Sequence, residues 1–194
     1  MFTDEKVFQL TSNRHIRIYR PNKTRYNEEY INNSNRSGRF SVNVWAWLSR
    51  HGLGVCWILN ERFNAITYKN ILENVMLPSV RHHFPENNFI LQQDNCPVHN
   101  AQIIKEYFAT NNVETMVWPA KCPDVNIIEN VWGMMTKKIY DINFRPQNRD
   151  TLINFIEQTW DELSDDPLLI ANLYSSIPRR LNEILERNGA MTKY

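Results

Sequence analysis

Three carboxylates stand at positions where rigid elements would hold them, and together they could bind metal ions. Asp94 directly follows the apolar run 88–93, Asp4 lies at the start of the first predicted strand, and Glu129 lies in the first turn of a predicted helix. Carboxylates that converge from separate elements can hold two hard divalent cations, and two such cations can bind both the attacking and the leaving oxygen of a phosphodiester. These residue types predict a site for Mg²⁺ or Mn²⁺ rather than for Zn²⁺.

Each of the three acids also has a structural interpretation. Asp94 could cap the helix that follows it, as Asn95 could. Glu129 forms an N-x-x-E pattern with Asn126, which is typical of a capping box, and Asp4 could be an ordinary surface acid. Spacing alone leaves these alternatives open.

Cys96 and His99 offer a competing constellation with Asp94 and the pair His82-His83. Their spacing matches none of the usual zinc pairs, and a thiol and an imidazole three residues apart on one helix do not make a base-activated nucleophile. We expect His99 to lie near the acidic site and to contact phosphate. The alternative is a partly buried structural histidine.

The composition is that of an ordinary globular domain, with 194 residues, 42% hydrophobic and 22% charged. None of the five glycines belongs to a strand, glycine loop and helix, so a nucleotide cofactor is not expected. Three cysteines without a CxxC spacing predict a reduced, intracellular protein. No apolar run approaches 18 residues, so no membrane span is expected.

The positive charge is concentrated near the N-terminus. Eight basic and two acidic residues lie between Thr11 and His51, a net charge of +6, whereas the other 14 basic and 19 acidic residues give −5. Basic residues interleaved with tyrosines suit a nucleic-acid backbone, although a solvated surface is the simpler alternative. The candidate DNA-binding residues here are Arg14, Arg17, Arg20, Lys23, Arg25, Arg36 and Arg39.

The first part of the chain has the period of half-buried strands. Alternation over 6–10 and 15–20 predicts a hairpin with its turn at Ser12-Asn13, and the runs 41–48 and 55–59 predict two more strands. This region is therefore an expected antiparallel meander.

The second part alternates helices with strands. A three-to-four-residue period predicts a helix over 64–84, and strands at 88–93 and 113–117 flank a helical pattern, as in a crossover unit with a parallel pair. Asp94 then lies at the carboxyl end of a strand, where such sheets bind ligands. Three further helices are expected: one capped by Asp124 or Asn126, one over 148–163, and one over 167–187 that Pro178 should break or kink and Asn188-Gly189 should close. The expected fold class is α/β, a mixed sheet with an antiparallel meander, flanked by helices.

Two motifs carry a resemblance to a known family. Residues 91–100 read LQQDNCPVHN, residues 118–133 read WPAKCPDVNIIENVWG, and 34 residues separate Asp94 from Glu129. The pattern closely resembles the catalytic domain of mariner-superfamily DDE transposases of the Tc-like branch, in which QDNxPxH is followed by WPxxSPDLNPIExxW. Further likeness upstream and downstream extends it over nearly the whole chain.

The resemblance implies a ribonuclease H-like fold with Asp4 on the first strand, Asp94 on the fourth and Glu129 on a following helix, all three binding two Mg²⁺ or Mn²⁺ ions. It implies an enzyme that uses water to nick DNA at transposon ends and then uses the freed 3′ hydroxyl to attack target DNA. Transposon-end and target DNA are then the partners, and the nucleus is the expected location. A homodimer is one assembly that the resemblance leaves open.

The chain also departs from the family pattern. Ile127 replaces a proline, Cys122 a serine, Val98 a small residue or cysteine, and Ala46 a common glycine, but no departure removes a carboxylate. Family members carry helix-turn-helix modules ahead of the catalytic domain, so residues 1–194 are expected to be the catalytic domain without them. Two alternatives stay open: a catalytically lapsed or domesticated DNA-binding protein, and a ribonuclease H-like nuclease without a role in transposition.

Overall fold

A computed structural model describes residues 1–10, 40–119, 123–140, 146 and 148–187. Strands β1 (Phe2–Leu10), β2 (Phe40–Ser49) and β3 (Gly52–Leu59) form an antiparallel sheet in the order β1-β2-β3. All nine residues of β1 pair with β2, from Phe2 opposite Leu48 to Leu10 opposite Phe40. The expected meander is confirmed, and β1 pairs with β2; the segment 15–20, the predicted hairpin partner of 6–10, lies outside the described residues.

A parallel pair extends this sheet beyond β1. Strands β4 (Ile90–Leu91) and β5 (Glu114–Thr115) run parallel, and a parallel bridge joins Phe2 to Gln92. The Gln92 amide donates to the Met1 carbonyl at 2.8 Å, and the Thr3 amide donates to the Gln92 carbonyl at 3.1 Å. The strand order is therefore β3-β2-β1-β4-β5, a mixed sheet as the sequence predicts.

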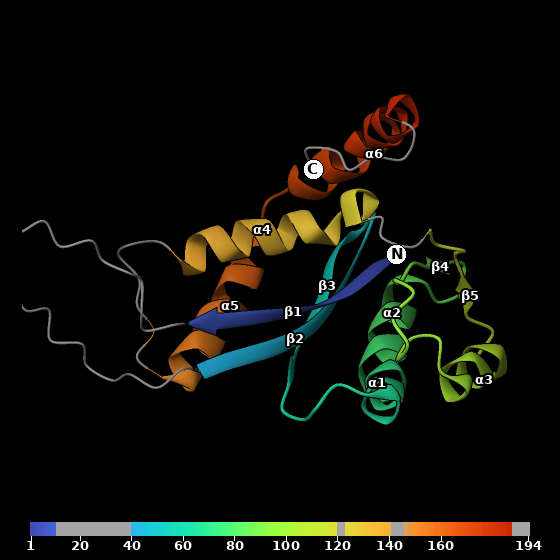
Figure 1. Cartoon of the computed structure of the whole chain (residues 1–194), viewed down its shortest axis with the longest axis horizontal. Helices are drawn as coiled ribbons and strands as arrows, with labels where there is room; N and C mark the ends of the chain where they lie inside the picture. Colours follow the sequence, from blue (N-terminus) through green and yellow to red (C-terminus); the bar gives the residue numbers. More distant parts are fainter. Residues whose placement is uncertain (11–39, 120–122, 141–145, 147, 188–194) are drawn as a thin grey trace, which may run out of the picture.

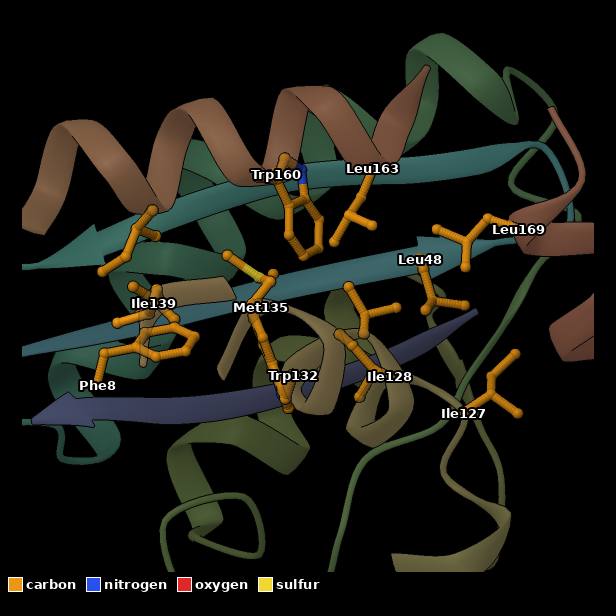
Figure 2. Packing of buried hydrophobic residues seen from close by; sticks show 14 of the residues in the cluster. Phe8, Leu48, Ile127, Ile128, Trp132, Met135, Ile139, Trp160, Leu163 and Leu169 are labelled. Atoms are coloured by element: carbon orange, nitrogen blue, oxygen red, sulfur yellow. The ribbon is translucent and has the colours of Figure 1, made fainter. Parts of the chain in front are cut away.

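One face of the antiparallel strands is covered by C-terminal helices (Figure 1). Helix α4 (Ile128–Ile139) lies along β1, preceded by a 3₁₀ turn, η3 (Pro123–Val125), while α5 (Arg149–Ser164) packs on β2 and β3 and α6 (Leu169–Glu186) contacts η3. Figure 2 shows the apolar side chains that fill this layer. Trp132 lies between Phe8 and Trp160 at ring distances of 6.1 and 5.7 Å. This packing fixes α4 over β1.

The other face carries the helices from the middle of the chain. Helix α1 (Ala65–Ile71), a π-helical segment, η2 (Leu72–Met76), and α2 (Leu77–His83) follow one another without a break, as the predicted helix over 64–84 requires. Together with α3 (Gln102–Thr110) they bury Trp45 and Trp47, whereas the neighbouring Val44 and Ala46 belong to the core beneath α4 and α5. Strand β2 is therefore buried on both faces.

The predicted break of a helix at Pro178 and the predicted side-chain caps of α4 are wrong. Helix α6 runs through Pro178 without ending there, and its closing pair Asn188-Gly189 lies outside the described residues. The N-cap of α4 is Ile127, which makes no side-chain capping bond, so neither Asp124 nor Asn126 caps this helix. Within the described part of the chain, none of the helices is both apolar and long enough for a membrane span.

Candidate active site

Asp4 lies on β1, and Asp94 follows the end of the short strand β4. An isolated parallel bridge joins Phe2 to Gln92, two residues before each of these acids. Glu129 lies in the first turn of α4, which packs along β1. The structure brings Asp4 and Glu129 together, since the charge of Glu129 helps to raise the pKa of Asp4, whereas Asp94 bonds to His99, which contacts Glu5.

The carboxylate of Asp4 is held in a crowded acidic environment. The indole Nε1 of Trp132 donates a hydrogen bond to Asp4 Oδ2 at 3.1 Å. Burial, then the charges of Glu129 and Glu5, raise the pKa of Asp4 to about 7. Sequence reasoning assigned Trp132 only to the core, although its position three residues after Glu129 puts both on one helix face. Trp132 is thus both a core residue and a hydrogen-bond donor in the site.

Glu129 does not act as the predicted capping residue. Helix α4 has no side-chain capping bond at its N-terminus, so the capping-box interpretation is wrong. Instead, Glu129 Oε2 lies 3.9 Å from Lys6 Nζ, on the strand that carries Asp4. The ammonium group of Lys6 therefore faces the carboxylate of Glu129, whose charge also acts on Asp4.

Asp94 is exposed, but one of its oxygens is firmly held. Oδ1 accepts hydrogen bonds from the Cys96 amide at 2.9 Å and from His99 Nδ1 at 2.7 Å. Its pKa is lowered, chiefly by the bond from His99. Helix α3 begins only at Gln102, so Asp94 closes the turn before that helix and does not cap it.

His99 lies between two carboxylates rather than at the surface. Its side chain is only 2% exposed, and Nε2 lies 3.2 Å from Glu5 Oε1 while Nδ1 faces Asp94. Burial alone would lower the pKa of His99, but hydrogen bonds to Asp94 and Glu5 outweigh it and raise this pKa to about 10. Because both ring nitrogens are engaged, this geometry argues against the phosphate contact expected of His99. The predicted basic residues from Arg14 to Arg39 lie outside the described residues.

The donor set fits a hard divalent cation. Asp4, Asp94 and Glu129 offer only carboxylate oxygens, the ligands preferred by Mg²⁺, and a bound cation would offset both the burial and the neighbouring charges that raise the pKa of Asp4. In the described parts of the chain, the one trio of His, Cys, Asp or Glu with ligand atoms within 4.8 Å of one another is Asp94, Cys96 and His99. Among the described residues, Asp4, Asp94 and Glu129 do not form such a closely spaced trio.

Comparison with known proteins identifies the family of this chain. A family profile described as DDE superfamily endonuclease matches residues 1–153. The chain belongs to the DDE superfamily of endonucleases. Among curated relatives, this DDE endonuclease chain is 29% identical over 195 residues to the Tc1 transposable-element transposase of Caenorhabditis elegans, covering all of this chain and 70% of the relative. It is equally similar, at 29% identity, to the Tc3 transposase of the same organism, of which it covers 57%.

Solved structures show the same fold at lower sequence identity. The DDE chain matches a Mos1 transposase paired-end complex with a TM-score of 0.75 and 19% identity, covering 99% of this chain and 55% of the Mos1 chain. It matches the isolated catalytic domain of Mos1 mariner transposase with a TM-score of 0.67 and 17% identity, covering 79% of this chain and 76% of that one. The chain thus spans about half of the longer Mos1 chain, and the ribonuclease H-like fold is confirmed.

Proposed function

We propose that this DDE chain is a transposase catalytic domain that cleaves DNA strands and transfers them to a target. The observation that carries the proposal is the position of the three acids in a mixed sheet: Asp4 on β1, Glu129 on α4, which packs along β1, and Asp94 after β4, which a bridge joins to β1. Family membership and the Tc1-type relatives give independent support. Residues 1–194 would act as one catalytic unit.

The proposed cofactors are two Mg²⁺ or Mn²⁺ ions held by these three carboxylates. Solved Mos1 catalytic-domain structures with Mg and with Mn support the choice of metal. When bound, the ions would stabilise the charge that develops on the attacking and leaving oxygens of the phosphodiester. The chain's own residues orient the ligands: Trp132 holds Asp4 Oδ2, and His99 holds Asp94 Oδ1.

The proposed partners are transposon-end DNA and target DNA. Structures of Mos1 as paired-end and strand-transfer complexes support this class of partner and suggest a dimer. The basic stretch from Arg14 to Arg39 would contact phosphates without reading base edges. Action on chromosomal DNA would place the protein in the nucleus.

The decisive experiment compares cleavage of duplex DNA by the wild type and by Asp94→Asn in Mg²⁺ or Mn²⁺. The substitution keeps the shape of the side chain but removes a charged ligand, so the cleavage rate should fall by orders of magnitude while DNA affinity changes little. Asp165→Asn, at an exposed residue after α5, is the matched control and should cleave like the wild type. Equal cleavage by wild type and Asp94→Asn would refute the proposal, and DNA binding without cleavage by the wild type would favour the lapsed alternative.

A further inference from the structure

Neighbouring acids on β1 serve opposite faces of the sheet. Successive residues of a strand point to opposite faces. Accordingly, Asp4 receives a hydrogen bond from Trp132 of α4 on one face, whereas Glu5 contacts His99, which lies in the turn before α3. The two acids are adjacent in the sequence but have different surroundings: Asp4 is a candidate site residue, and Glu5 contacts His99.

The ring of His99 is oriented by its surroundings as well as by its hydrogen bonds. The ring of Tyr68 packs against it at a centroid distance of 4.6 Å, and Phe63 contacts it edge-on at 5.9 Å. Tyr68 is itself fixed, because its hydroxyl donates to Gln93 Oε1 at 2.7 Å. The imidazole therefore has one defined direction, with Nε2 toward Glu5 and Nδ1 toward Asp94.

This direction determines how Asp94 presents its carboxylate. The bonds from His99 and from the Cys96 amide both end on Oδ1, at 2.7 and 2.9 Å. Among the described residues, Oδ2 receives no hydrogen bond. One oxygen of an otherwise exposed carboxylate is thus fixed, and the other is left for a ligand.

We propose that Glu5 and His99 form an outer-shell pair that positions the Asp94 carboxylate for metal binding. Glu5 orients the imidazole through Nε2, and the imidazole orients Asp94 through Nδ1. Partners of this kind typically change metal affinity or activity by about 10–100-fold when they are removed. The inference rests on the proposed function, since it takes Asp94 as a metal ligand.

The two nitrogens of His99 can be tested separately. The amide nitrogen of asparagine can replace Nδ1, and that of glutamine can replace Nε2. His99→Asn should therefore keep the bond to Asp94, His99→Gln should keep only the bond to Glu5, and His99→Leu should lose both. Glu5→Gln removes the charge that orients the ring. His82→Asn, at an exposed histidine of α2, is the matched control.

The measured quantity is the dissociation constant for Mn²⁺, obtained without DNA from the electron paramagnetic resonance signal of free Mn²⁺. We expect this constant to rise at least about tenfold in His99→Leu and in His99→Gln, less in His99→Asn, and severalfold in Glu5→Gln. The His82→Asn control should match the wild type. DNA affinity should stay unchanged in all variants, because residues that position a metal ligand change the affinity for the metal and not for DNA.

The outcomes separate this inference from the proposed function. A wild type that binds no Mn²⁺ would overturn both. A wild type that binds Mn²⁺ and cleaves DNA, with unchanged Mn²⁺ affinity in His99→Gln and Glu5→Gln, would overturn the inference alone. If His99→Leu fails to fold, the order of the Asn and Gln variants decides: equal affinities would show that the Nδ1 bond does not position Asp94.

Discussion

Replacing Asp4 by asparagine should stabilise the metal-free protein, and this stabilisation should grow as the pH rises. The carboxylate of Asp4 is buried beside Glu129 and Glu5, and these surroundings raise its pKa to about 7. Asparagine has nearly the same shape and can still accept the hydrogen bond from Trp132, which lies at 3.1 Å in the wild type. The variant therefore removes a charge that the metal-free fold tolerates poorly.

The sign and size follow from proton linkage. Between the ordinary pKa of 3.8 and the raised value of about 7, the folded state binds more protons than the unfolded state, so wild-type stability falls as pH rises through this window. Above pH 8, the raised pKa of Asp4 lowers the free energy of unfolding of the wild type by roughly 4 kcal/mol. Roughly 1.5 kcal/mol of this is already lost at pH 5. The free-energy advantage of Asp4→Asn should therefore widen by roughly 2–3 kcal/mol between pH 5 and pH 8.

Urea denaturation in EDTA, followed by tryptophan fluorescence and circular dichroism at several pH values, measures this difference directly. Titrating groups that do not interact with Asp4 act equally in both proteins and cancel, and Asp165→Asn serves as an exposed control that should show no such widening. Adding Mn²⁺ should make the wild type more stable than Asp4→Asn, because only the wild type has the Asp4 carboxylate to bind the metal. A pH-independent difference, or a variant less stable than the wild type at pH 8 in EDTA, would refute the reasoning.

Saturating Mn²⁺, at about a hundred times its dissociation constant, should raise the unfolding free energy of the wild type by about 2.7 kcal/mol, and much less in Asp94→Asn; a melting temperature insensitive to Mn²⁺ in folded wild type would contradict the metal site. The imidazole of His99 should be doubly protonated at pH 8, since its pKa is raised to about 10, and a neutral ring in the ¹⁵N NMR spectrum at that pH would disprove the bridging geometry. Gly54→Ala should destabilise the fold by about 3 kcal/mol in urea titrations, because an added Cβ would lie 2.0 Å from a ring carbon of the buried Trp47; unchanged stability would show that Trp47 can move freely.

The local pattern of the sequence was sufficient for most elements. The runs 41–48 and 55–59 predict the strands that become β2 and β3, and the helical period over 148–163 predicts α5 almost residue for residue. Such patterns work because burial against one layer repeats every two residues in a strand and every 3.6 in a helix. The motifs around Asp94 and Glu129 led to the family for a similar reason, since they occupy short, continuous stretches of chain.

Pairings between distant segments were decided by the tertiary structure alone. No local pattern indicates that β1 pairs with β2 on one side and reaches β4 on the other. Helix α6 continues through Pro178, although an interior proline by itself favours a break in the helix. The propensity of a segment to form a strand does not specify which other strand it pairs with. The partner is selected by the packing of the whole sheet.

The surroundings of the candidate site are the clearest example of contacts that the tertiary structure decided. His99 is 94 positions from Glu5, and Trp132 is 128 from Asp4, and no local pattern links either pair. These contacts exist because β1 lies between the turn before α3 and helix α4, with its alternate residues directed to opposite faces. The sequence by itself therefore determined which carboxylates could do chemistry, and the packing of both faces of the sheet decided which neutral and charged side chains hold them.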